Sequence, residues 1–399
     1  MPDNLAGSGA GANLRLRKQL LEGIEQLKAG DLEAARARFA EVLEGNPESA
    51  AAHLGLGRVY FLEQDMQSAL QCFQEALARD PKSSMAKVMI ARVHEQLGDV
   101  DAAMEDYEEA SEIDPSRGVA QRRISRIFAQ HGDYGEAVGR LRDALQHNPQ
   151  QVATRFMLAN VLERSGDLSA AKTELQRVLE LKPDAGIAAY RLGRLHLRDG
   201  EMETARALLE KAVRLLPDKG APRLALGAAL KGVGDFEQAL VVLQEAQKHA
   251  ANPSSVTMLI AECQIKLGQS EEALKSLRQA LRRSRRPSVL HKRLGDLLTS
   301  LGRYGEAIEE YRAAILNHPE LAESQPELVT LIDKAQTPGE DVEGLAKQVQ
   351  TMMASISAAK RAEKEGQSQV MDDNLGAPET PRRAGMQRFG RMRRMRGAR

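Results

Sequence analysis

A spacing of 34 residues constrains this sequence more than any other feature. An alanine returns at that interval nine times without an insertion or deletion. The nine positions are Ala35, Ala69, Ala103, Ala137, Ala171, Ala205, Ala239, Ala273 and Ala307. Twelve residues before each alanine the chain has Gly, Ala or Ser, and four residues after it Phe, Tyr or Leu. Such a period indicates repeated supersecondary units that pack on their neighbours, and it argues against one large globular core.

Each unit is predicted to contain two helices. The alanine and the apolar residues four and seven positions after it fall on one stripe of a helix. A preceding helix carries the small residue in its middle, as Gly57 does within the apolar pattern of residues 54–60. Glycine inside a helix costs about 1 kcal/mol relative to alanine. Its presence there in five units predicts that the second helix passes too close for a side chain.

The turn residues support the same division. Glycine, followed by aspartate or a variant, separates the two helices in eight units, and the second unit has Gln64 and Asp65 instead. Glycine ends a helix in a left-handed cap, and the aspartate, where present, caps the second helix. Proline closes seven units, and in the other two it comes two residues later, at Pro253 and Pro287. Those two junctions are therefore expected to differ from the rest.

These residues resemble a known family. The order Leu-Gly-x-x-Tyr, Ala, aromatic, Ala, Pro, complete in residues 56–81, resembles the tetratricopeptide repeat. The resemblance departs from the family in lacking Trp and in placing His94 or His196 where the family has Tyr, and these histidines are expected to be core residues. It implies an all-α fold, a right-handed superhelical solenoid of antiparallel helix pairs (TPR). The first helices of the pairs are then expected to line a concave groove.

The repeat divides the chain into four expected parts. A flexible N-terminus covers residues 1–15, and the nine-repeat solenoid covers 16–321. A capping helix plus an extra helix occupy 322–366, and a disordered Arg-rich tail occupies 367–399, because its composition buries too little apolar surface to fold. The extra helix, about 341–364, has apolar residues at the coiled-coil spacing of three and four. It is expected to fold onto the last repeat, and a dimer seam is the alternative.

Composition excludes several classes of function. Lys and Arg together number 56 and so do Asp and Glu, but residues 376–399 hold eight Arg and one Glu, which leaves 48 basic and 55 acidic side chains elsewhere. Cys72 and Cys263 are the only cysteines and are 191 residues apart, a pattern that gives neither a disulfide framework nor a thiolate metal cluster. No phosphate loop or catalytic constellation is found. We therefore expect neither an enzyme nor a cofactor, a metal or a small-molecule substrate.

The start of the chain bears on its location. Residues 1–20 lack the apolar core of a secretory signal, and no apolar run reaches 18 residues anywhere in the sequence. The expected localisation is cytoplasmic.

A series of arginines marks the candidate binding groove. One residue after the small position, on the face away from the second helix, units two to six carry Arg, Arg, Arg, Asn and Arg. With residues four positions earlier, the predicted partner-binding set is Arg58, Arg92, Arg122, Arg126, Phe156, Asn160, Tyr190 and Arg194. The planar guanidinium fork suits carboxylates and backbone carbonyls, so the series predicts an extended, acidic peptide or partner protein. The alternative is that these arginines pair internally, for example with Glu95 or Glu163.

An acidic run in the third unit suggests a second contact. It comprises Glu105, Asp106, Glu108, Glu109, Glu112 and Asp114. Such a run is usually a hydrated helix face. The other interpretation is that it docks onto the basic groove of another copy, which would produce self-association.

The tail supports a rival hypothesis of function. Its candidate contacts are Arg388, Phe389, Arg391, Arg393, Arg394 and Arg396. They suit RNA, anionic lipid or an acidic protein, unless the tail is only a solubilising extension. The favoured hypothesis is a non-catalytic scaffold or adaptor for protein partners. The alternative is a nucleic-acid- or membrane-associated adaptor that acts chiefly through this tail.

Overall fold

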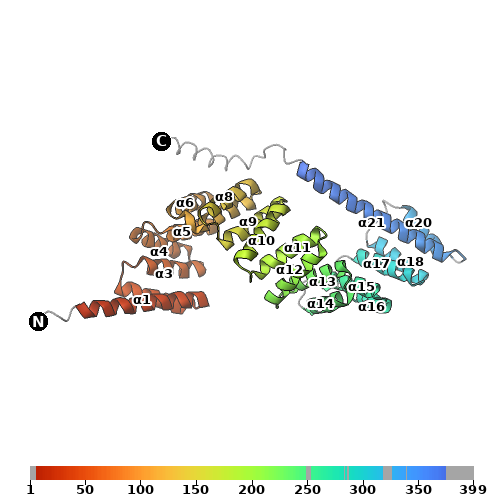
Figure 1. Ribbon diagram of the computed structural model, residues 1–399, viewed down its shortest axis with the longest axis horizontal. Coiled ribbons are helices and arrows are strands. Elements are labelled where there is room, and N and C mark those ends of the chain that lie inside the picture. The colour runs from red at the N-terminus through yellow and green to blue at the C-terminus, as the bar shows by residue number, and fades with distance from the viewer. Residues whose placement is uncertain are drawn as a thin grey trace. The chain divides into compact units, whose positions relative to one another are not determined.

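The computed structural model describes the chain from residue 6 to residue 373 with short gaps. The described parts are residues 6–248, 253–282, 284, 287–317, 326–337 and 339–373. In them the chain forms helices joined by short turns, and no strand (Figure 1). Two compact units are present, one ending at Ala229 and the other beginning at Leu230.

The first unit is a series of antiparallel helix pairs. In chain order the described helices are α1 (Ala6–Ala29), α2 (Leu32–Gly45), α3 (Ala50–Leu62), α4 (Met66–Arg79), α5 (Ser84–Leu97), α6 (Val100–Ile113), α7 (Val119–Gln130), α8 (Tyr134–His147), α9 (Val152–Ser165), α10 (Leu168–Leu181), α11 (Gly186–Arg198) and α12 (Met202–Leu215). Helix α13 (Gly220–Val233) contains the division between the units. Odd-numbered helices are the first helices of the predicted repeats.

The second unit continues the pattern and then departs from it. Its described helices are α14 (Phe236–Lys248), α15 (Pro253–Lys266), α16 (Ser270–Leu281), α17 (Pro287–Ser300), α18 (Tyr304–Leu316), α20 (Pro326–Ala335) and α21 (Val342–Asp373). Helices α15 and α17 begin at the two shifted prolines, where a missing N–H is tolerated. The residues immediately before these two helices lie outside the described part.

The predicted close crossing of the two helices in a repeat is confirmed. A Cβ atom added to Gly57 would lie 2.6 Å from Cε1 of Phe73 in α4, and one added to Gly193 would lie 2.7 Å from Cγ of Leu209 in α12. Phe73 and Leu209 are both fully buried. The small residue is therefore required because the large residue of the second helix fills the space next to it.

The turns follow the predicted chemistry, with one strained exception. Gly98 ends α5 with φ 82°, and the side chain of Asp99 accepts a hydrogen bond from the Ala102 amide at 3.0 Å. In the second repeat Gln64 takes the same left-handed conformation, with φ 65°. It is the single non-glycine residue with positive φ in the part of the chain that the structure describes. That conformation crowds a side chain against the backbone.

One irregular junction was not predicted. After α6 a short 3-10 helix, η1 (Pro115–Arg117), leads to Gly118 with φ 59°, and α7 then starts at Val119. In the sequence, Pro115 has the same place as the proline of regular repeats. The extra turn ends at Gly118, whereas Gly186 and Gly220, at the same position of later repeats, begin helices α11 and α13 directly.

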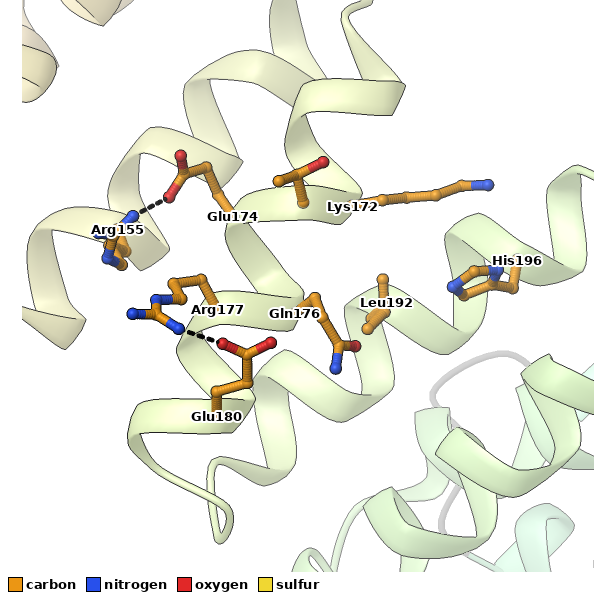
Figure 2. A pocket seen from close by; sticks show the side chains of 9 residues that line it. Arg155, Lys172, Glu174, Gln176, Arg177, Glu180, Leu192 and His196 are labelled. Atoms are coloured by element: carbon orange, nitrogen blue, oxygen red, sulfur yellow. Dashed lines mark hydrogen bonds and ion pairs between the residues drawn. The ribbon is translucent and has the colours of Figure 1, made fainter. Parts of the chain in front are cut away.

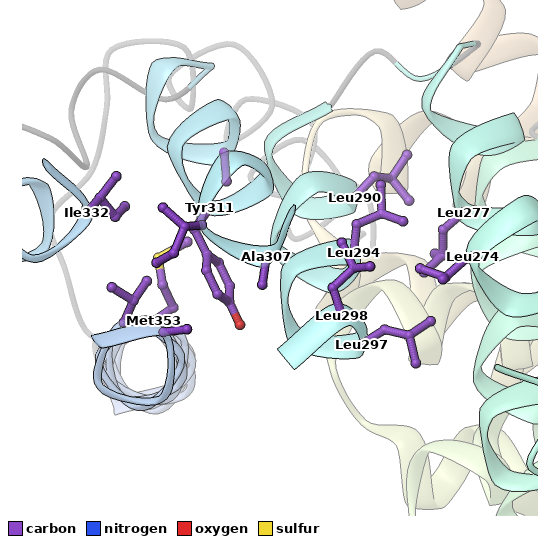
Figure 3. Close-up of a cluster of buried hydrophobic side chains, with 14 of the residues drawn as sticks. Leu274, Leu277, Leu290, Leu294, Leu297, Leu298, Ala307, Tyr311, Ile332 and Met353 are labelled. Carbon is purple, nitrogen blue, oxygen red and sulfur yellow. The ribbon is translucent and has the colours of Figure 1, made fainter. Parts of the chain in front are cut away.

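The C-terminal helices cover the last repeat. From α21, Leu345, Ala346, Val349 and Met353 are buried in one apolar cluster with Tyr311 of α18. Helix α20 contributes to the same cluster through Ile332 (Figure 3). The described part of α21 thus packs on the last repeat, as expected for the extra helix, and this burial argues against a free dimer seam over residues 342–356.

Both ends of the helical part run longer than the sequence predicts. Helix α1 begins at Ala6, within the stretch expected to be flexible, and α21 continues to Asp373, past the expected start of the tail. At the first end, alanines and Leu14 favour a helix in spite of the glycines. Residues 374–399, including the six candidate tail contacts from Arg388 to Arg396, lie outside the described residues.

Candidate interaction surface

The predicted arginines lie on neighbouring first helices that are joined by their own side chains. We call the side chains of α3, α5, α7, α9 and α11 on this side the Arg face. Its members are Arg58, Arg92, Glu95, Arg122, Arg123, Arg126, Phe156, Asn160, Glu163, Tyr190, Arg191 and Arg194. Contacts among them and with adjacent residues link α3 to α5, α5 to α7, α7 to α9, and α9 to α11. The Arg face therefore continues across five repeats of the first unit.

Internal pairing accounts for part of the Arg face. Glu95 forms an ion pair with Arg126, and its other oxygen lies 3.8 Å from Nη1 of Arg123. That carboxylate also accepts a hydrogen bond of 2.8 Å from the hydroxyl of Tyr107, a fully buried residue of α6. Burial, followed by the neighbouring Glu95 charge, raises the pKa of Tyr107, so this hydroxyl stays a donor. Pairing with Glu95, the alternative interpretation of these arginines, is thus present for Arg126.

Glu163 pairs with a residue that the sequence analysis passed over. Arg191 donates to both oxygens of Glu163, with Nη2 2.9 Å from Oε2, and also to Oδ1 of Asn160 at 3.1 Å. Arg191 and Arg123 stand three residues before Arg194 and Arg126. Residues three apart share a helix face, so this spacing was the signal that would have found them.

Three arginines of the predicted series have no carboxylate partner among the described residues. Arg92 lies over the ring of Phe61, 4.5 Å from its centroid, and Arg194 lies 5.7 Å from the centroid of Tyr190. Arg58 is exposed to solvent. Burial, and then the nearby positive charge of Arg123, lowers the pKa of Arg92. These groups therefore present donors that the described part of the chain does not neutralise.

Arg122 has a different role from the other members. Its Nη1 donates to Oε1 of Gln151 at 2.9 Å and to Oγ1 of Thr154 at 3.0 Å, and Thr154 is fully buried. Burial and the charge of Arg123 lower the pKa of Arg122. Arg122 joins α7 to the start of α9. Its role is therefore to hold the two helices together, and its bonded Nη1 is not free for a partner.

Each aromatic member of the Arg face lies under a guanidinium group, which comes either from the next turn of the same helix or from the neighbouring helix. Phe156 of α9 lies under the guanidinium of Arg191, 5.3 Å from the ring centroid. Tyr190 supports Arg194 in the same way. An aromatic ring below a guanidinium attracts its charge and leaves the edge of the fork for other acceptors.

The corresponding positions of the second unit are acidic and internally neutralised. Glu262 of α15 pairs with Lys231 and, at 2.6 Å, with Arg293. Asp296 of α17 pairs with Lys292 at 2.9 Å and accepts a hydrogen bond of 2.9 Å from Tyr311. The excess of cations is thus a property of the first unit.

The acidic run of α6 is partly neutralised as well. Asp106 accepts contacts of 2.8 Å from both Lys87 and Nδ1 of His94, and Glu109 lies 2.8 Å from the same lysine. Glu108 pairs with Arg140 at 2.7 Å. Because these carboxylates already have cations, the run offers fewer free charges to a second copy than its sequence suggests. His94 lies at the edge of the core, where it contacts Asp106.

A hollow of about 530 Å³ lies elsewhere, beside α10. Figure 2 shows Arg155 directed at Glu174, and Arg177 at Glu180, so these charges of its lining are paired with one another. The members of the Arg face do not line it. Among the described residues no His, Cys, Asp or Glu cluster is suited to hold a metal ion. In the same part of the chain, every helix is too short or too polar to span a bilayer.

Comparison with known families agrees with the repeat architecture. Two family models described as tetratricopeptide repeat match the sequence; one matches residues 20–84, 65–118, 122–171, 156–219 and 259–326, and the other 196–263. Together these matches cover most of the chain. The chain belongs to the tetratricopeptide repeat family. No curated protein sequence matches it.

Several solved TPR structures are similar over part of the chain. MamA from Desulfovibrio magneticus RS-1, from its residue 41, is 21% identical, covers 42% of this chain and 94% of its own, and has a TM-score of 0.40. PilF of Pseudomonas aeruginosa is 20% identical over 53% of this chain and 97% of its own, with a TM-score of 0.44. The C-terminal part of a TPR protein from Cytophaga hutchinsonii is 14% identical; the match covers 59% of this chain and 98% of that protein, with a TM-score of 0.45.

Proposed function

We propose that this TPR protein is a non-catalytic scaffold whose Arg face holds an extended, acidic segment of a partner protein. The family supports a role in protein interaction. The observation that carries the finer proposal is the set of three arginines, Arg58, Arg92 and Arg194, that recur at the repeat spacing without a carboxylate partner among the described residues.

Charge along the Arg face favours an anionic occupant. Its named members comprise seven arginines and two glutamates, so five positive charges remain after pairing. An extended peptide that spans several repeats can place one carboxylate near each unpaired guanidinium. The neutralised charges of the second unit offer no such excess. The binding segment is therefore expected to lie along repeats two to six.

Neutralising the three unpaired arginines tests this proposal. The variant carries Arg58→Gln, Arg92→Gln and Arg194→Gln, and the probe is a fluorescein-labelled peptide library of degenerate Asp, Glu, Ser and Gly positions. Exposed ion pairs contribute about 0.2–1 kcal/mol each, so the loss of three should weaken binding, measured by anisotropy, by about threefold to about 150-fold.

The matched control removes the same charge elsewhere. Arg142, Arg177 and Arg278 are exposed on second helices, and changing all three to Gln lowers the net charge equally. This control should bind the library as the unchanged protein does, and circular dichroism should show equal helicity in both variants. Equal weakening in both, or in neither, would reject the assignment to the Arg face.

The rival hypothesis attributes binding to the tail, whose residues 376–399 hold eight Arg and one Glu. Removing these residues separates the two proposals. A scaffold that uses the Arg face keeps its affinity for the acidic library. An adaptor that uses the tail loses its affinity for RNA or anionic vesicles when the tail is removed. In the intact chain, that affinity should fall steeply with added salt.

A further inference from the structure

Guanidinium groups are not evenly distributed over the Arg face. At the contact of α5 with α7, Arg126 pairs with Glu95 and Arg123 lies 3.8 Å from the same carboxylate, while Arg92 stands three residues before Glu95 on α5 and does not contact it. We infer that this cluster recognises a phosphoryl group carried by the bound peptide, on a phosphoserine or phosphothreonine. The inference rests on the proposed function and adds one specific chemical group to it.

Glu95 is held in place as a fixed counter-ion. Tyr107 donates to its Oε2 at 2.8 Å from the buried side, and Arg126 contacts its Oε1 from the neighbouring helix. The side chain of Glu95 is only 18% exposed, against 41% for Arg126. Because the carboxylate is tethered from below, it orients the arginines and leaves their outer edges to solvent.

Donors in the cluster outnumber acceptors. Each guanidinium has five N–H donors. Nη1 of Arg92 donates to Sδ of Met89 at 3.4 Å, and thioether sulfur is a weak acceptor. Nε of Arg126 is buried without an acceptor in the part of the chain that the structure describes. An additional anion with several oxygens would satisfy donors that Glu95 leaves free.

Charge distinguishes a phosphoryl group from a carboxylate at this place. Three guanidiniums and one carboxylate leave two positive charges. A phosphorylated side chain carries about −1.5 to −2 charges and three acceptor oxygens at neutral pH, whereas a carboxylate carries one charge. Arg58 is the only member of the Arg face in its repeat, and Arg191 beside Arg194 is already paired with Glu163, so Arg58 and Arg194 suit single carboxylates. The cluster alone matches a doubly charged group.

Three labelled peptide libraries test the inference on the full chain. Their flanking positions are degenerate in Asp, Glu, Ser and Gly, and the fixed central residue is phosphoserine, aspartate or serine. We expect the phosphoserine library to bind about tenfold more tightly than the aspartate library, which corresponds to about 1.4 kcal/mol. Equal affinity for these two libraries overturns the inference and leaves the proposed function standing. If none of the three libraries, whose flanks all contain Asp and Glu, binds the chain, both the inference and the proposed function fail.

Variants assign the preference to the cluster. Arg92→Gln and Arg123→Gln should each reduce the tenfold preference to within about twofold, whereas Arg58→Gln should weaken both acidic libraries equally. Glu95→Gln keeps an acceptor for Tyr107 but removes the counter-charge, so it should strengthen phosphoserine binding several-fold, a gain that misfolding cannot produce. A preference that survives the first two variants, or no gain in Glu95→Gln, overturns the inference.

Inorganic phosphate separates a peptide site from a free-anion site. Added at the same concentration as the phosphoserine library, it should displace less than about a tenth of the bound probe, because it lacks the flanking contacts. Displacement of half the probe at that concentration would show that the cluster serves free phosphate, and the inference would be wrong.

Discussion

The substitution Gly57→Ala tests the reason for the small residue in the first helix. A methyl group there would lie 2.6 Å from Cε1 and 2.7 Å from Cδ1 of Phe73, and 3.1 Å from Cβ of Cys72. Phe73 is fully buried and packs with Ala69, Met89 and Val93. Its ring therefore cannot move aside without disturbing the interface between the second and third repeats.

Two opposing contributions set the size of the effect. Alanine is favoured over glycine inside a helix by about 1 kcal/mol. Inserting a methyl group into a packed core costs about 1–3 kcal/mol, and contacts below 3 Å with a rigid ring place this site at the upper end. The free energy of unfolding should therefore fall by about 1–2 kcal/mol, although the same change in an open helix raises it.

Urea unfolding followed by far-ultraviolet circular dichroism measures the change. Repeat arrays unfold segment by segment, so hydrogen exchange should place the loss in α3 and α4. Gly139→Ala is the matched control, because Gly139 is exposed in α8 and has no atom within 4 Å of its added Cβ. That control should gain about 0.5–1 kcal/mol.

A second change in the same contact completes the test. With Phe73→Leu already present, Gly57→Ala should become nearly neutral, since the fifth repeat pairs Ala159 with a fully buried Leu175 in these positions. If Gly57→Ala raises stability as much as Gly139→Ala does, the close-crossing argument is wrong.

Three further outcomes follow from local chemistry. Gln64→Gly should raise the thermal midpoint, with a gain of about 0.5–1 kcal/mol, because Gln64 has φ 65° in the described structure and glycine tolerates that conformation; a lower midpoint would contradict this. Burial, and then the charge of Glu75, raises the pKa of Cys72 to about 11, so iodoacetamide at pH 8 should label it about 100-fold more slowly than free cysteine, and equal rates would refute it. Hydrogen bonds from Ser68 lower the pKa of Asp65, so its stabilising contribution is complete above about pH 4 and is lost as the pH falls through the lowered value; the unfolding free energy of Asp65→Asn should be less sensitive to pH between 2 and 5.

The helix pairs could be predicted because every repeat carries the same contact. The same close contact recurs at the repeat spacing, between Gly57 and Phe73 and between Gly193 and Leu209. Each repeat therefore supports the interpretation of the others. The exception at Pro115 could not be predicted in this way. Gly118 takes φ 59° after its 3-10 turn, whereas Gly186 and Gly220 at the same repeat position begin ordinary helices, and glycine tolerates both conformations.

The free and paired arginines could not be separated from the sequence. Arg191 and Arg194 follow Glu163 by 28 and 31 residues, and only the side chain of Arg191 reaches it from α11. Arg194 lies over Tyr190 instead. Which of two residues three positions apart meets a carboxylate depends on the displacement between adjacent helices, and that displacement has no signature in one sequence.

Photo-crosslinking from the Arg face tests the central claim most directly. A benzoylphenylalanine placed at Asn160, which is exposed on α9, should crosslink to the acidic peptide library on irradiation. The same group placed at Gly139 on α8 is the control and should remain unlinked. Crosslinking from Asn160 that disappears when Arg92 and Arg194 are changed to Gln is the result we predict. Equal crosslinking from both positions, or crosslinking only from Gly139, would contradict the claim that this scaffold binds its partner along the first helices.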